Sequence, residues 1–176
     1  MPIEFQLLDA LQTIHTPWLD PFMVFITTLG NGGFIWIILT GLFLLFPKTR
    51  CLGYAMALSL LLEALCCNVL LKPLVARIRP FDINMMIPLL IPTPHDFSFP
   101  SGHAGASFAV ASALFFAKSR YWIPACILAC LMAFSRLYLY VHYPSDVLAA
   151  IGIGFLTGWM AHRFLKKRCH KMTDTD

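Results

Sequence analysis

The stretch Phe99-Pro100-Ser101-Gly102-His103 ends an irregular segment and opens a long apolar run. Serine is a favourable N-cap residue, and glycine lets another group come close to the backbone. The free N–H groups at a helix N-terminus attract anions such as phosphate. The stretch therefore predicts a helix that starts near Ser101 and carries a candidate oxyanion site at its first turn.

The rest of the chain is strongly apolar. Its 176 residues are 59% hydrophobic and only 12% charged, with a mean hydropathy of +0.72. A soluble domain needs more charge than this to cover its surface. The length allows one domain, so residues 1–176 are interpreted as a single membrane-embedded domain. The net charge of +4 comes largely from the basic tail at residues 163–176, and it does not indicate nucleic acid as a partner.

The apolar runs predict an all-α, polytopic transmembrane helix bundle. A helix crosses the apolar core with about 20 residues. The expected crossings are Phe22–Phe46, Leu52–Leu71, His103–Ala117, Tyr121–Tyr140 and Val147–Leu165, within a class of about five to six spans. The sequence Gly30-Asn31-Gly32-Gly33 interrupts the first run, which is either one kinked span or a dip followed by a span.

Residues 1–20 precede the first of these crossings and are too polar to form another one. Between residues 3 and 14 the apolar side chains fall on one helical face: Ile3, Leu7, Leu8, Leu11 and Ile14. This pattern is typical of a short helix that lies in the membrane interface.

The basic residues predict the orientation of the bundle. They gather on one side of the predicted topology: Lys48, Arg50, Lys118, Arg120, Arg163, Lys166, Lys167, Arg168 and Lys171. By the positive-inside rule this side, with the C-terminus, is cytoplasmic. The Ser101 stretch and two further polar clusters then face the extracytoplasmic side of the inner or plasma membrane.

The second polar cluster lies at the end of the run Leu52–Leu71. Lys72 and Arg79 are seven residues apart, so a continuous helix would place both cations on one face. Pro73 disfavours a helical conformation at Lys72, which predicts a kink or a restart there. Arg79-Pro80 marks the end of the segment.

The third cluster joins the last two predicted spans. Arg136 lies near the end of an apolar run and needs an anionic partner. Asp146 follows His142 by four residues, a spacing that lets the carboxylate accept one ring N–H and leaves the other nitrogen free for attack. Alternatively, Asp146 caps the last helix and His142 is an interfacial residue.

Two more polar residues, Arg77 and Asp96, are interpreted as structural, and the role of a third, Glu63, is left open. Arg77 is assigned to lipid headgroups, which long cations at span ends often reach. Asp96 lies in the irregular segment at residues 81–99 and is interpreted as a solvated loop residue. Glu63 lies inside a predicted span, where an acid usually faces the bundle interior; its role is left open.

Together the clusters place three cations, a helix N-terminus, two histidines and one carboxylate on the same side of the membrane. The six cysteines include no CxxC pair, and no three closely spaced ligands indicate a metal site. Fixed cations and N–H groups suit the equatorial oxygens of a transferring phosphoryl group. One histidine would attack, while the other would manage the leaving-group proton.

The three clusters match a known tripartite signature. Lys72 is followed after six residues by Arg79-Pro80, and Pro100-Ser101-Gly102-His103 comes next. The third part is Ser135-Arg136, then His142, then Asp146. In this order and spacing the chain resembles the type 2 phosphatidic acid phosphatase superfamily, over residues 72–146. Members of this superfamily often have six spans, whereas here the first span is reduced to an interfacial helix. This difference affects the expected substrate entrance and not the catalytic core.

The resemblance implies a metal-independent lipid phosphatase without cofactors. His142 would form a phosphohistidine and Asp146 would orient it, while His103 would protonate the leaving oxygen and later activate water. The phosphate would be bound by a set of five residues: Lys72, Arg79, Ser101, Gly102 and Arg136.

The motifs recognise the phosphate alone, so several substrates stay open. The compact chain favours undecaprenyl diphosphate, converted to undecaprenyl phosphate. The alternatives are phosphatidic acid, phosphatidylglycerophosphate and a lipid A phosphate. A vanadate-dependent haloperoxidase and a non-catalytic lipid-phosphate binder are more distant interpretations, and the oligomeric state is not indicated.

Overall fold

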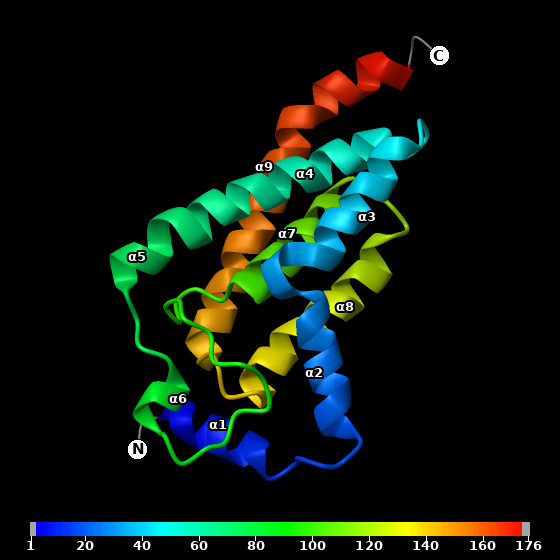
Figure 1. Cartoon of the computed structure of the whole chain (residues 1–176). Helices are drawn as coiled ribbons and strands as arrows, with labels where there is room; N and C mark the ends of the chain where they lie inside the picture. The colour runs from blue at the N-terminus through cyan, green and yellow to red at the C-terminus, as the bar shows by residue number, and fades with distance from the viewer. Residues whose placement is uncertain (1–2, 174–176) are drawn as a thin grey trace.

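The computed structural model describes residues 3–173, with side chains up to residue 166, and its regular structure there is entirely helical. This confirms the all-α class (Figure 1). The helices are α1 (Ile3–Gln12), α2 (Leu19–Leu29), η1 (Asn31–Gly33), α3 (Phe34–Leu45), α4 (Arg50–Ala64), η2 (Leu65–Leu71), α5 (Lys72–Val75), α6 (Pro80–Ile83), α7 (Gly102–Phe116), α8 (Trp122–Tyr138) and α9 (Pro144–Thr173).

Helix α7 is the centre of the bundle, and α4, α8 and α9 pack around it (Figure 1). Most of its residues are Ala, Gly or Ser. Small residues let membrane helices approach closely. On α9, a Cβ atom added at Gly154 would lie 2.6 Å from the Gly105 carbonyl oxygen of α7. Glycine is therefore required where α7 and α9 touch.

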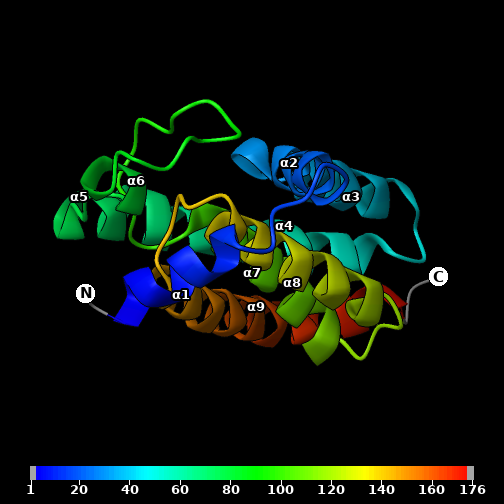
Figure 2. The same cartoon turned by 90° about the horizontal axis from the view of Figure 1, so that it is seen from below.

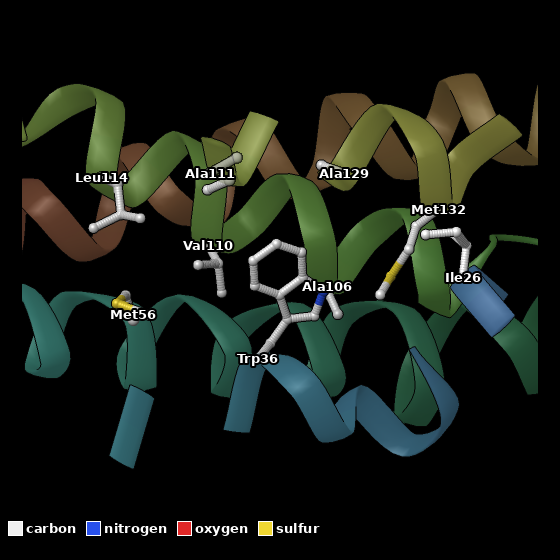
Figure 3. Packing of buried hydrophobic residues seen from close by; sticks show 10 residues of the cluster. Ile26, Trp36, Met56, Ala106, Val110, Ala111, Leu114, Ala129 and Met132 are labelled. Atoms are coloured by element: carbon white, nitrogen blue, oxygen red, sulfur yellow. The ribbon is translucent and has the colours of Figure 1, made fainter. Parts of the chain in front are cut away.

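The largest apolar core fills the space between α7 and its neighbours α3, α4 and α8 (Figure 3). Trp36 of α3 is buried there, and its indole N–H donates to the Ser107 hydroxyl of α7 at 2.9 Å. The other fully or nearly buried members include Ile26, Met56, Ala106, Val110, Leu114, Ala129 and Met132. This core fixes the bundle around α7 and so places the start of α7, at Ser101, against its neighbours.

The first apolar run is bent where the sequence predicts an interruption. The segments Leu19–Leu29 and Asn31–Leu45 meet at 49°. Gly32 and Gly33 have φ values of 59° and 74°, in the left-handed region that glycine adopts without steric cost. The bend brings the chain at Thr27–Asn31 against the start of α7.

The region around Lys72 confirms a restart of the α-helix at that residue, but Lys72 itself is helical, contrary to the prediction. The chain passes from α4 through the π-helical segment η2 directly into α5, and Lys72 is helical at φ −57° and ψ −53°. Pro73 lies in the first turn of α5, and the π-helical register change in η2 directly before it accommodates the missing N–H. The helix ends at Val75, and the next residue, Ala76, has a left-handed backbone conformation with φ 47°.

The number of crossings stays a prediction. Two segments are long and apolar enough to span a membrane: Arg50–Ile83, which holds α4 to α6, and Pro144–Lys166 in α9. The bent pair formed by α2, η1 and α3 would be a third. Helices α7 and α8 are apolar but shorter, at 15 and 17 residues.

The predicted N-terminal helix is present as α1, which lies across the end of the bundle near α6, α8 and the start of α9 (Figure 2). The sequence pattern predicts that its apolar side chains share one environment, but in the structure they do not. Leu8 is fully buried against α8, whereas Ile3 and Leu7 are exposed. The cause is tertiary packing, which uses part of the apolar face as core. Placement of α1 in the membrane interface remains a prediction.

The α7–α9 contact predicts a contrast between two glycines of one helix. In Gly158→Ala the new Cβ would lie 2.6 Å from the Ala113 backbone nitrogen, so we expect a loss of about 1–3 kcal/mol of stability. Gly152→Ala meets nothing within 4 Å and should be neutral or slightly stabilising. Thermal unfolding in detergent compares the two. Equal stability of both variants would contradict the close packing of α7 and α9.

Candidate active site

Lys72 and Arg79 meet at the carboxylate of Asp96. Lys72 pairs with one Asp96 oxygen, and Arg79 Nη2 donates to the other at 2.5 Å. Arg79 also donates through Nε to the Asp96 carbonyl at 2.8 Å and is only 3% exposed. Burial raises the pKa of Asp96, but Lys72 and Arg79 outweigh it and lower this pKa to about 2. The carboxylate is therefore ionised at neutral pH.

This geometry corrects two predictions. Lys72 and Arg79 do not share the face of one helix, because α5 ends at Val75 and Arg79 is extended at φ −75° and ψ 155°. Asp96 is not merely solvated: it holds both cations together. The loop of residues 84–101 brings it back over the site, a long-range contact that local sequence does not encode.

His142 lies in the short connection between α8 and α9 and is 1% exposed. Its Nε2 is 3.3 Å from Arg79 Nη1, and its Nδ1 is 3.6 Å from Asp146 Oδ2. The second distance exceeds that of a normal N–H···O bond. Burial, opposed by the nearby carboxylate, lowers the pKa of His142 to about 3. At neutral pH the imidazole is therefore uncharged, as a nucleophile must be.

Asp146, in the first turn of α9, is fully buried and has several donors. Its Oδ2 accepts from the Ser98 hydroxyl at 2.5 Å and the Tyr143 N–H at 2.9 Å, while Oδ1 accepts from Arg77 at 2.5 Å. The predicted pairing of Asp146 with His142 is present as close proximity. The strong hydrogen bonds of the carboxylate go to other groups.

The start of α7 has the predicted position but not the predicted cap. Ser101 is the N-cap residue, yet its hydroxyl makes no capping bond, and its buried oxygen lacks a hydrogen-bond partner. The Ser101 N–H instead donates to the Asp146 carbonyl at 3.3 Å. A Cβ atom at Gly102 would lie 3.1 Å from Asn68 Oδ1 of η2. The close approach expected at Gly102 is thus made by Asn68.

His103 and Arg136 meet at the bend of the first apolar run. His103 Nε2 is 3.1 Å from both the Thr27 carbonyl oxygen and Asn31 Oδ1. A Cβ atom at Gly30 would lie 2.5 Å from the His103 ring, so glycine makes room for it. Arg136 is 3% exposed, donates to the Thr27 hydroxyl, and keeps its Nε without a partner.

One cavity of about 730 Å³ joins these groups. His142, His103, Lys72, Arg79 and Arg136 all line it, together with Asp96 and Gly102. Its other walls are mostly apolar and come from α2, α3, α4 and the loop before α7, including Val24, Ile37, Leu60, Leu61, Leu90 and Ile91. A cavity with cations at one part and apolar walls elsewhere suits a ligand with a phosphate head and a hydrocarbon tail.

Arg77 differs from its sequence interpretation, whereas Glu63 faces the bundle interior as expected. Arg77, expected at lipid headgroups, is turned inward onto Asp146 and Glu4 of α1. Glu63 is buried with one unpartnered oxygen and lines the cavity. The position of Arg77 has no local sequence signal, because its partners Asp146 and Glu4 are 69 and 73 residues away.

A protein-family model described as the PAP2 superfamily matches residues 48–169, which hold all three polar clusters. The chain belongs to the PAP2 superfamily. This confirms the resemblance inferred from the motifs.

Individual PAP2 relatives cover most of the chain. The undecaprenyl-diphosphatase of Sulfolobus acidocaldarius is 36% identical over 81% of this chain and 68% of its own length. The lipid A 4'-phosphatase of Bacteroides thetaiotaomicron is 33% identical over 97% of this chain and 79% of its own. A transmembrane PAP2-type phosphatidylglycerolphosphate phosphatase from Bacillus subtilis superposes with a TM-score of 0.77, at 30% identity over 94% of this chain and 85% of that structure. The chain is accordingly a multi-pass membrane lipid phosphatase.

The contact of Asp96 with the two cations leads to a prediction about phosphate binding. In Asp96→Asn the carboxylate that competes for Lys72 and Arg79 is gone, so inorganic phosphate should inhibit about fivefold more tightly. Asp82→Asn, an exposed acid on α6, is the matched control and should leave the inhibition constant unchanged. Weaker inhibition in Asp96→Asn would mean that Asp96 positions the cations and does not compete with the phosphate.

Proposed function

We propose that this protein hydrolyses a polyprenyl diphosphate, undecaprenyl diphosphate, to the monophosphate on the extracytoplasmic side of the cell membrane. The observation that carries the proposal is the single cavity shared by His142, His103 and three cations. Its apolar walls would receive the first part of the lipid tail. The undecaprenyl-diphosphatase among the relatives supports this substrate.

In the first step His142 Nε2 attacks the terminal phosphorus. An N–P bond forms while the P–O bond to the lipid monophosphate breaks. Lys72, Arg79, Arg136 and the N–H groups at the start of α7 would hold the equatorial oxygens, where charge accumulates in the transition state. Arg79 is already 3.3 Å from the attacking nitrogen, which supports this assignment.

His103 would manage the protons on the leaving side. It donates a proton to the departing oxygen in the first step and takes one from water in the second, when the water oxygen attacks phosphorus and the N–P bond breaks. Asp146, 3.6 Å from Nδ1 of His142, would hold that ring in the tautomer with a free Nε2.

The orientation rests on the separation of basic residues from the site. The α3–α4 and α7–α8 connections and the C-terminal part of α9 lie at one end of the bundle, away from α5, α6 and α1 (Figure 1). These regions carry Lys48, Arg50, Lys118, Arg120, Arg163 and Lys166. The side chains of Lys167, Arg168 and Lys171 lie outside the described part of the chain. The positive-inside rule favours a cytoplasmic C-terminus and an extracytoplasmic site.

No three His, Cys, Asp or Glu side chains come together as metal ligands within residues 3–166. We propose that the cations lining the cavity, Lys72, Arg79 and Arg136, perform the charge stabilisation and that the reaction needs no divalent ion. The purified protein should release phosphate in EDTA. A loss of activity in EDTA that a divalent ion restores would refute this part of the proposal.

The substrate is tested by phosphate release from undecaprenyl diphosphate, phosphatidic acid, phosphatidylglycerophosphate and a lipid A phosphate under identical detergent conditions. We expect the diphosphate to have the highest kcat/KM. Preference for one of the monoesters would change the substrate and leave the chemistry in place. Release from none of them would refute the proposed activity and favour a lipid-phosphate binder.

The nucleophile is tested by His142→Ala. Turnover should fall by about a thousandfold or more, while binding of the lipid phosphate is largely kept because the cations are intact. His162→Ala, a histidine on α9 outside the cavity, is the control and should retain activity. Turnover that survives in His142→Ala would show that another group attacks.

A further inference from the structure

Both carboxylate oxygens of Asp146, the residue next to the His142 ring, accept hydrogen bonds. Its Oδ2, the oxygen nearer to His142, accepts from Ser98 and from the Tyr143 N–H. Its Oδ1 accepts from Arg77 Nη1 at 2.5 Å. Because Asp146 is fully buried, an oxygen without a donor would be costly. Arg77 therefore sets the rotation of this carboxylate and, with it, the oxygen that is presented to His142.

Arg77 is itself held by three further contacts. Its Nη2 donates to Glu4 of α1 at 2.7 Å, and its Nη1 donates to the Ser145 hydroxyl at 2.7 Å. The guanidinium lies over the Tyr143 ring at 3.8 Å from the centroid, a cation–π distance. An arginine with this many fixed partners is pre-organised, in contrast to a cation free to reach lipid headgroups.

Glu4, which accepts a hydrogen bond from Arg77, also binds Ser145 next to Asp146. Its Oε1 accepts from both the Ser145 N–H at 3.1 Å and the Ser145 hydroxyl at 2.6 Å. Burial raises the pKa of Glu4, but the bonds from Ser145 and Arg77 outweigh it and hold this pKa below its usual value. The carboxylate is therefore charged at neutral pH and can hold Arg77.

The position of these groups separates them from the phosphate-binding cations. Lys72, Arg79 and Arg136 line the cavity, whereas Arg77 and Glu4 do not. Arg77 contacts Oδ1 of Asp146, whereas His142 is near Oδ2, so the two side chains contact different oxygens of one carboxylate. The effect of Arg77 on the reaction must pass through Asp146.

We propose that Arg77 is a positioning residue for His142, acting through Asp146, and that Glu4 on the N-terminal helix α1 sets the position of Arg77. The proposal rests on the assignment of His142 as the nucleophile. It gives α1 a part in the reaction: an acid at residue 4 orients the machinery at residues 142–146 through an arginine at residue 77.

The charge of Arg77 gives the proposal a pH signature. Charged or titratable groups face the His142–Asp146 pair from every neighbouring element: Arg77 and Arg79 from the α5–α6 connection, Arg136 from α8, His103 from α7, Asp96 from the loop, Tyr143 from the α8–α9 connection, and Glu4 of α1 behind Arg77. Removing the Arg77 cation makes the pair bind a proton more tightly. The neutral imidazole would then be lost at a higher pH, and the acid limb of the activity profile would move upward.

The first test compares Arg77→Lys and Arg77→Met with the parent enzyme. We expect kcat to fall about 10- to 100-fold in Arg77→Met, with KM changed less than about threefold, because remote misplacement of a reacting group has this effect. Arg77→Lys keeps the charge but not the fork of donors, so it should restore part of kcat and the parental acid limb. A variant that only loosens the fold would lower the rate equally at all pH values.

The second test uses Glu4→Gln, which keeps an acceptor for Ser145 and removes the ion pair with Arg77. We expect kcat to fall about 3- to 10-fold with KM unchanged. Asp9→Asn is the matched control, because Asp9 lies on the same helix and accepts from Tyr140 at 2.6 Å without contacting Arg77 or Asp146. This variant should retain parental kcat.

Unchanged kcat and acid limb in both Arg77→Met and Glu4→Gln would overturn the proposal, as would equal losses in Glu4→Gln and Asp9→Asn. If Arg77→Met does not fold, Arg77→Lys and Glu4→Gln decide alone. His142→Ala is assayed in parallel. Its inactivity beside fully active Arg77 and Glu4 variants would refute the positioning role and leave the nucleophile assignment intact.

Discussion

Buried cations without enough anions of their own are the constraint on which the site depends. Arg79 and Arg136 are each 3% exposed in an apolar bundle. Arg136 donates to the Thr27 hydroxyl, and its Nε has no hydrogen-bond partner among the residues that the structure describes. Charges removed from water cost several kcal/mol each unless they are compensated. In the mechanism proposed above, a phosphate that enters the cavity would supply this compensation, and the same cations would then stabilise the charge that grows on its oxygens as the bond to phosphorus breaks.

The fold brings the charged residues of the site together because the backbones of α7 and α9 pack very closely. Helix α7 is built of small residues, so α9 can approach it at Gly154 and carry Asp146 and His142 to the start of α7. The bend at Gly32–Gly33 turns Thr27 and Asn31 toward His103. Three segments far apart in sequence therefore meet beside one cavity, while the apolar core that includes Trp36 and Val110 packs the bundle together (Figure 3).

Much of this arrangement could be predicted from the sequence, because the motif residues have fixed spacings and the apolar runs have helical lengths. The helices, the bend at Gly30–Gly33 and the convergence of Lys72, His103 and His142 follow from such local signals. Arg77 and Asp96 could not be placed, since their partners are brought by α1 and by an irregular loop. The helical path through Pro73 depends on the π-helical register change before it, which composition does not reveal. At Ser101, the N-cap preference predicts where α7 begins, but it does not predict that the hydroxyl is buried without a hydrogen-bond partner among the described residues.

The measurement that tests the central claim most directly is detection of the covalent intermediate. The protein is mixed with lipid diphosphate labelled at the terminal phosphate, quenched within milliseconds at alkaline pH, and digested for mass spectrometry. The account predicts a phosphohistidine on His142 that forms before free phosphate appears and is absent in His142→Ala. Its yield should rise in His103→Ala if hydrolysis of the intermediate slows more than its formation. Turnover with no label on His142 at any time, or label on another residue, would contradict the account.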